Sequence, residues 1–213
     1  MQSVASNSAG RLRLASFRQE SASPEIKGDA VATIQRWTRD FLMSDHPELG
    51  RAGHVCPFTA FGARIDTLRF GASDAKAGDA YRIRRELLGA FAQLDEIPHS
   101  KKMGVYRAVL IAFPGCADED GVKTLSRVQK SLRLTSFLRG RMIGVFHANA
   151  PEPGLWNKDF RPLRAPLPLV AIRSLVAADA AFVLRHPLLA PIYFYNFPLA
   201  AARQLAEAAL RKA

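Results

Sequence analysis

The stretch MIGVFHANAPEPGLWNKDFRPLRAPLPLVAIR, residues 142–173, decides the fold because it holds two short apolar runs separated by a loop. The first run, residues 142–146, is β-branched and aromatic and follows Arg141, which predicts a buried strand. The second run, residues 167–176, predicts another strand. His147 comes directly after the first run, at the end of a rigid element, where it can present a neutral imidazole to a metal or cofactor.

Three arginines follow this histidine. Arg161 and Arg164 lie in the loop, and Arg173 interrupts the second apolar run. An arginine inside such a run has to meet an anion, because an unpaired buried guanidinium costs several kcal/mol. That anion is either an acid group of a cofactor or substrate, or an aspartate or glutamate of the protein itself. His147 leaves the same two alternatives open, a ligand or a hydrogen-bonded core histidine.

Helical and strand-like patterns alternate along the rest of the chain. Apolar residues recur every three or four positions in residues 30–44, 81–97 and 118–140, which predicts three amphipathic helices. Residues 105–113 predict a further clear strand, and residues 67–70 a weaker one. Strands separated by helices predict a mixed α/β or α+β domain in which helices cover a small mixed sheet.

The two ends of the chain differ from this pattern. Residues 1–28 are poor in large apolar side chains, so we expect a flexible tail before a single domain of residues 29–213. Near the other end, residues 178–184 predict one or two helical turns. The aromatic, proline-broken residues 186–199 predict irregular packing, and residues 199–210 a last helix.

Composition narrows the class of protein. The two cysteines, Cys56 and Cys116, are far apart, so neither a zinc finger nor a disulfide framework is encoded and a reducing cytoplasm fits best. No apolar run approaches about 18 residues, which predicts no membrane span and no secretory signal. The net charge of +11 favours an anionic partner, yet no known nucleic-acid recognition motif is found.

Few chemical motifs remain as candidates, because the P-loop, G-x-G-x-x-G, H-E-x-x-H and G-x-S-x-G patterns are all missing from the sequence. Cys56 precedes a proline in a loop, a setting of several haem thiolates, although a buried hydrophobic cysteine is the alternative. A two-histidine, one-carboxylate iron site has no helical spacing to support it. Its candidate histidines are His54, His99, His147 and His186.

Haem suits these features better. A single histidine or cysteinate is enough to hold the iron, aromatic side chains cover the ring, and arginines neutralise the propionates. The predicted aromatic walls are Phe58, Phe146, Trp156 and Phe160.

Four segments together resemble a known group of proteins: GRAGHVCPF, AFPGCADEDGVKTLSRVQKSL, MIGVFHANAPEPGLWN and FRPLRAPLPLVAIRSLV. They are similar to an uncharacterised bacterial domain family often carried by secondary-metabolite gene clusters, and VCPF and FRPLR are the most specific parts. More distantly, the order of a Pro/Cys loop, a long helix and a strand ending in Gly-x-x-His resembles the YqcI/YcgG family. Some members of that family are haem-dependent oxygenases that hydroxylate nitrogen atoms of amino acids.

This resemblance implies a cytoplasmic haem b oxygenase that oxidises a nitrogen of a small, carboxylate-bearing substrate in specialised metabolism. His147 corresponds by position to the iron ligand, with Cys56 as the alternative, since the Cys-Pro order here is the reverse of the family's. Arg161, Arg164 and Arg173 would then bind propionates or substrate, and Trp156 and Asn157 would line the pocket mouth. The electron donor and self-association into a homodimer are left open. A non-catalytic module that binds an anionic ligand or acidic partner through the arginines, and a non-haem iron enzyme, are the rival hypotheses.

Overall fold

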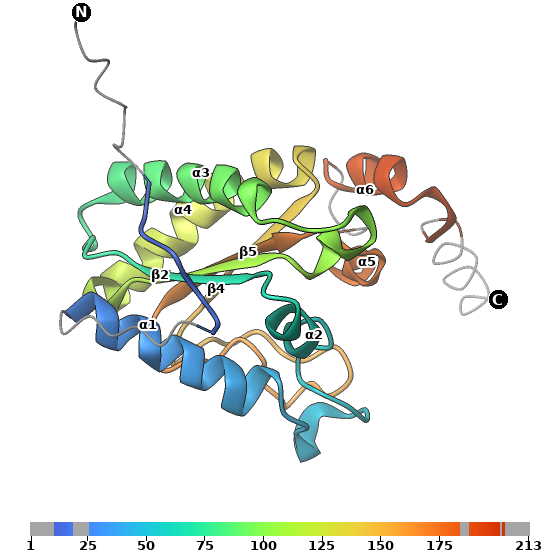
Figure 1. Ribbon diagram of the computed structural model, residues 1–213, viewed down its shortest axis with the longest axis horizontal. Helices are drawn as coiled ribbons and strands as arrows, with labels where there is room; N and C mark the ends of the chain where they lie inside the picture. The colour runs from blue at the N-terminus through green and yellow to red at the C-terminus, as the bar shows by residue number, and fades with distance from the viewer. Residues whose placement is uncertain (1–10, 19–25, 184–187, 201, 203–213) are drawn as a thin grey trace, which may run out of the picture.

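A five-stranded mixed sheet organises the residues that the computed structural model describes, which are residues 11–18, 26–183, 188–200 and 202 (Figure 1). Helices cover both faces of the sheet, so the predicted mixed α/β single domain is confirmed. The strands are β1 (Ala15–Ser16), β2 (Leu68–Ala72), β3 (Ala108–Ala112), β4 (Arg141–Phe146) and β5 (Leu169–Ser174). The α-helices are α1 (Ile26–Trp37), α2 (Thr59–Arg64), α3 (Ala80–Glu96), α4 (Glu119–Leu138), α5 (Ala180–Val183) and α6 (Ala190–Asn196).

The strand order is β1-β2-β3-β5-β4. Strands β2 and β3 are parallel, whereas β5 is antiparallel to both of its neighbours, β3 and β4. Strands β2, β3 and β4 therefore point the same way and are joined by α3 and α4. Both crossovers move across the sheet in the same direction, so right-handed connections place both helices on one face.

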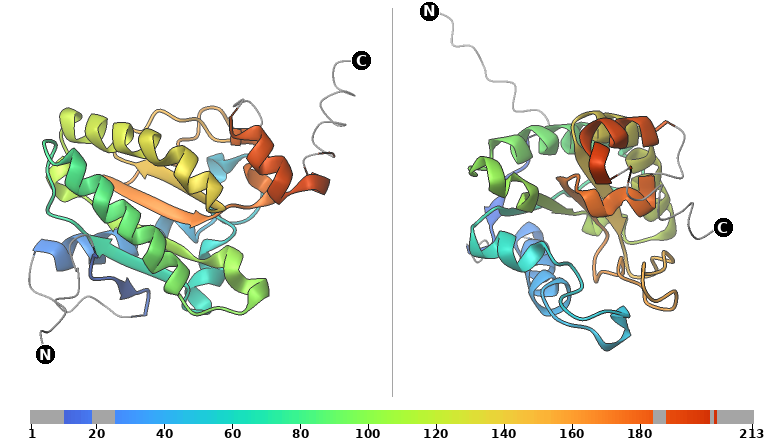
Figure 2. Two further views of the ribbon diagram at one scale, coloured as in Figure 1. Left: turned by 90° about the horizontal axis from the view of Figure 1, so that it is seen from above. Right: turned by 90° about the vertical axis from the view of Figure 1, so that its right-hand side faces the viewer.

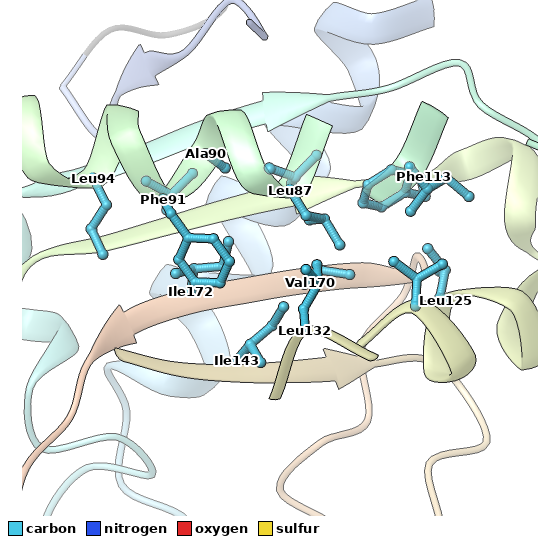
Figure 3. Packing of buried hydrophobic residues seen from close by; sticks show 14 of the residues in the cluster. Leu87, Ala90, Phe91, Leu94, Phe113, Leu125, Leu132, Ile143, Val170 and Ile172 are labelled. Atoms are coloured by element: carbon cyan, nitrogen blue, oxygen red, sulfur yellow. The ribbon is translucent and has the colours of Figure 1, made fainter. Parts of the chain in front are cut away.

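Figure 2 shows α3 and α4 over one face of the sheet, and this face holds the larger core, part of which Figure 3 shows from close by. Val109 and Ile111 of β3 face these helices, while Leu110 and Ala112 face the opposite side, because successive strand residues point to opposite faces. In Figure 3, Phe91 points from α3 toward the sheet. The periodic apolar positions predicted from the sequence thus form the core.

The opposite face is covered by α1, by α2 and by the long loop between β4 and β5 (Figure 1). Ala30, Val31 and Ile34 of α1 pack against β2 and β3. Helix α1 runs into a π-helical turn, Thr38–Leu42, a feature that occurs frequently at functional sites. The hydroxyl of Thr38 in that turn is buried and has no partner among the described residues.

Three sequence expectations differ from the structure. Strand β4 was expected to be buried, but it is the edge strand, and Ile143 is its one buried residue. The expected strand at residues 105–113 is shorter, because Lys101–Tyr106 form a 3-10 helix. Irregular packing was expected for residues 186–199, but α6 forms there, with Pro191 in its first turn, where proline needs no amide donor.

The expected flexible tail is also wrong for residues 11–18. Their side chains are few but well placed: Leu12 and Leu14 pack on the core below α3 and α4, and Phe17 packs on the α1 side. Strand β1 also pairs with β2, with Ala15 opposite Phe70. The predicted last helix at 199–210 lies almost wholly outside the described residues.

Both edges of the sheet are capped by glutamine side chains of the covering helices. On the β1 side, Gln35 of α1 donates to the carbonyl of Ser16 at 3.1 Å, and Gln93 of α3 donates to the carbonyl of Leu12 at 2.7 Å. On the other edge, Gln129 of α4 donates to the carbonyl of Ile143 at 3.0 Å.

Candidate functional site

His147 lies where the sequence predicted, at the carboxyl end of β4. Its backbone is fixed on both sides by the returning loop: the amide donates to the carbonyl of Leu163 at 3.2 Å, and its carbonyl accepts from the amide of Ala165 at 3.3 Å. The imidazole is half-buried and has no hydrogen bond to any other described residue. The strand and loop thus hold this histidine in place and leave its ring available.

The arginine turn, residues 161–164, lies beside His147 because of that pairing. The amide of Arg164 bonds the carbonyl of Arg161 at 3.3 Å, and Pro162 in the second position favours such a turn. The Arg161 guanidinium donates to the carbonyl of Phe160 at 3.2 Å, and Arg164 is exposed. Neither has a carboxylate partner in the described part of the chain.

Aromatic rings from distant parts of the sequence meet next to this loop. Trp37 contacts Phe146 edge-on with ring centroids 5.7 Å apart, and it stacks on Phe41 at 5.8 Å. Phe41 in turn lies 6.0 Å from Phe160. We call Trp37, Phe41, His46, Phe146 and Phe160 the aromatic cluster. Phe146 and Phe160 were predicted from the sequence as ring walls, whereas Trp37 and Phe41 belong to the amphipathic helix predicted over residues 30–44.

His46 is the member of the aromatic cluster that sequence reasoning missed. Its ring lies 4.7 Å from that of Phe160, and its Nδ1 accepts from the amide of Glu48 at 3.2 Å, which caps a short 3-10 helix, Pro47–Leu49. Because Nδ1 accepts a hydrogen bond, Nε2 carries the proton in the neutral ring and offers no lone pair to a metal. The His-Pro pair signals the cap, but nothing in the sequence signals the contact with Phe160.

The predicted mouth residues pack the two loops together. The side-chain Nδ2 of Asn157 donates to the backbone carbonyl of Glu48 at 2.8 Å. Gly50 has a φ of +78°, and a Cβ placed there would lie 3.1 Å from the backbone of Trp156, so glycine is required on both counts. The Trp156 side chain is 67% exposed. The GRAGHVCPF and FRPLR segments therefore belong to adjoining loops.

Cys56, Phe58 and Arg173 lie away from His147, toward the opposite end of the sheet. Cys56 lies just before α2, which packs at the start of β2, whereas His147 follows the end of the parallel strand β4. Phe58 contacts Tyr106, which precedes β3, with ring centroids 6.0 Å apart. The two proposed iron ligands therefore lie on elements at different ends of the sheet.

Arg173 meets an anion of the protein itself. Its guanidinium donates to both carboxylate oxygens of Asp179, at 2.8 and 2.5 Å, and Asp179 is 1% exposed. Burial acts to lower the pKa of Arg173, but the hydrogen bonds and charge of Asp179, with a smaller contribution from Cys56, leave that pKa raised. This arginine is committed to a structural ion pair.

The remaining titratable candidates are also engaged. His54 bonds Asp45 at 2.9 Å, and His99 bonds the carbonyl of Ile97 at 2.9 Å. His186 lies outside the described residues. Across the described ranges, no three histidine, cysteine, aspartate or glutamate side chains gather as a metal site would require.

A haem site needs an iron ligand, cations for the propionates and an apolar slot for the porphyrin. His147 offers a ligand nitrogen, and Arg161 and Arg164 offer cations. For the third requirement, an apolar slot for the porphyrin, the rings of Phe146 and Phe160 would have to move apart from Trp37 and Phe41, against which they now pack. The arrangement fits an anionic ligand on the loop better than a buried macrocycle.

The fold and this loop region define a mixed α/β domain of the kind expected from the sequence. Residues 31–208 match the family described as Domain of unknown function (DUF6875), and the chain belongs to this family. No curated protein matches the sequence significantly, and no solved structure does. No described helix is long and apolar enough to cross a membrane.

Proposed function

We propose that this domain binds a small anionic molecule on the loop that holds His147 and the arginine turn. The observation that carries the proposal is the backbone pairing of His147 with residues 163 and 165, which places the arginine turn next to His147. Neither Arg161 nor Arg164 has a carboxylate partner among the described residues. Arginine suits this role because its planar donors match carboxylate and phosphate oxygens. The net charge of +11 attracts such ligands from a distance.

A direct test compares arginine variants by calorimetry with citrate and inorganic phosphate as probes. Arg161→Leu and Arg164→Leu should each weaken binding about tenfold or more, since each removes a charge-assisted contact of roughly 1.5–3 kcal/mol. Arg84→Leu, an exposed arginine on α3, is the matched control and should leave binding unchanged. Equal losses in all three variants would show a general charge effect and contradict the proposal.

A haem-dependent oxygenase acting on an amino-acid nitrogen is the second candidate, and the available imidazole of His147 favours it. Haem would supply the oxygen-activating chemistry, with His147 as its ligand and Arg161 and Arg164 near its propionates. The aromatic cluster would first have to open, because its rings now pack together.

Titration with haemin separates the two candidates. A Soret band that is lost in His147→Ala but kept in His99→Ala would support the oxygenase, since His99 is an exposed histidine elsewhere. If haemin keeps its free spectrum at every ratio of haemin to protein, and citrate binds, the result would support only the anion-binding function. A Soret shift that is retained in His147→Ala but lost in Cys56→Ser would identify Cys56, at the opposite end of the sheet, as the iron ligand.

A further inference from the structure

Helix α6 lies beside the C-terminal turn of α4 (Figure 2), and residues of both helices line a solvent-open hollow. We call it the α4–α6 groove. It is lined by Leu138, Pro191, Ile192, Tyr195 and Asn196.

Exposed apolar side chains are most frequent in the segments that contain this groove. The described residues include ten large apolar side chains that are exposed to solvent, and six of the ten come from the second half of α4 and from residues 182–199. Leu138 is 68% exposed and Tyr195 is 88% exposed. A gathering of this kind on a protein surface marks an interaction site more often than chance exposure does.

The spacing of these side chains matches a helical partner. Leu134 and Leu138 are four residues apart on α4, and Pro191 and Tyr195, which both line the groove, are four residues apart on α6. Two such rows, one on each wall, suit an amphipathic helix that lays its apolar face between them.

The charge around the groove selects the kind of helix. Arg127, Lys130 and Arg133 are exposed on α4 and have no carboxylate partner among the described residues. The acidic residues of α4 lie at its other end, where Glu119 pairs with Lys123 at 2.6 Å, about 28 Å away from Leu138 at 1.5 Å of rise per residue. A second copy of this chain would bring the same cations against them.

We propose that the α4–α6 groove binds an amphipathic helix of a partner protein whose polar face is acidic. The apolar rows hold the partner's leucine-like side chains, and the basic face of α4 pairs with its carboxylates. The anion-binding loop plays no part in this interface, because it lies on the opposite face of the sheet (Figure 1).

The probe is a labelled 18-residue peptide with leucine at i, i+3, i+4 and i+7 and glutamate on the flanking positions, and its control has lysine at every glutamate. Fluorescence anisotropy with the full chain should show binding of the glutamate peptide only. Tyr195→Ala should weaken it about tenfold, as expected for a central aromatic contact. Tyr81→Ala, an equally exposed tyrosine on α3, should change it less than twofold.

Charge is tested in the same assay. Arg133→Glu should weaken the glutamate peptide at least threefold and flatten its salt dependence, whereas Arg84→Glu should not. The proposal is overturned if both peptides bind alike, if neither binds, or if the two tyrosine variants lose affinity equally. It is also overturned if Tyr195→Ala removes binding to phosphatidylserine vesicles or to duplex DNA while binding to the peptide persists. Binding of the peptide only after residues 203–213 are deleted would overturn it as well.

Discussion

The two faces of the sheet are held by different kinds of contact. Under α3 and α4 the core is mostly aliphatic, and its side chains come from helices with a regular apolar period. Under α1 and the loops, aromatic rings from segments more than a hundred residues apart meet, as His46 and Phe160 do. The first face provides stability, and the second provides a surface whose shape depends on long-range loop contacts.

The largest expected effect is on the free energy of unfolding, and it compares one aromatic side chain from each face of the sheet. Phe91→Ala removes a fully buried ring under α3 and should lower the free energy of unfolding by about 4 kcal/mol. Phe41→Ala, in the half-buried aromatic cluster, should cost about 2 kcal/mol, because less area is lost from burial. Denaturant unfolding of both variants measures the difference, and equal losses would show that the faces contribute alike.

Residues 11–18 join the two faces, so their removal should also have a large effect. Leu12 and Leu14 pack on one core cluster, and Ala15 and Phe17 on the other. Deleting residues 1–18 should therefore lower the free energy of unfolding by about 3 kcal/mol, at roughly 1 kcal/mol for each of the three large half-buried side chains, Leu12, Leu14 and Phe17. The sequence alone predicts almost no change, so unfolding curves of the shortened chain decide between the two expectations.

Cys116 gives the α3–α4 face a dependence on pH. Burial, with smaller effects of Asp118 and Asp79, raises the pKa of its thiol from 9.0 to about 11. Between these values the unfolded chain loses the proton and the folded chain keeps it, so stability is full below pH 9 and falls as pH rises toward 11.

At pH 10 the loss should be about 1 kcal/mol relative to pH 8. Unfolding of Cys116→Ala at both pH values provides the control, because the variant should lack this part of the pH dependence. If the variant and the unchanged protein lose the same stability between pH 8 and 10, the thiol is not the titrating group.

The smallest expected effect is on the loop. Arg164→Leu changes an exposed side chain without a carboxylate partner among the described residues, so the free energy of unfolding should shift by less than about 0.5 kcal/mol. Thermal unfolding beside the ligand titration checks this. A large loss of stability would place Arg164 in a structural role and remove it from the proposed binding site.

Much of the fold could be predicted from the sequence, because its long elements have strong local signals. The periods of residues 81–97 and 118–140 correspond to α3 and α4, and Asp118 caps α4 by accepting from the amide of Gly121 at 2.7 Å. The runs at 142–146 and 167–176 correspond to β4 and β5. Strand β1 could not be found, since two paired residues have no period.

The candidate site was only partly predictable. The sequence placed His147 at a strand end, which local pattern decides. Whether Arg173 meets an internal carboxylate or a ligand depends on Asp179, whose side chain approaches only when the chain turns after β5. The distance between Cys56 and His147 likewise depends on the directions of the strands, which periodicity does not reveal.

The glutamine caps have a consequence for how copies of this chain can associate. A sheet edge with unbonded carbonyls is a template on which another chain can add a strand, and this is one route to fibrils. Here Gln35 and Gln129 already occupy carbonyl groups at the two outer strands, and Ser136 occupies the carbonyl of Arg141 at 2.7 Å. Addition of a strand from another molecule is therefore disfavoured at these positions, and we expect copies of this domain to associate through helices and loops.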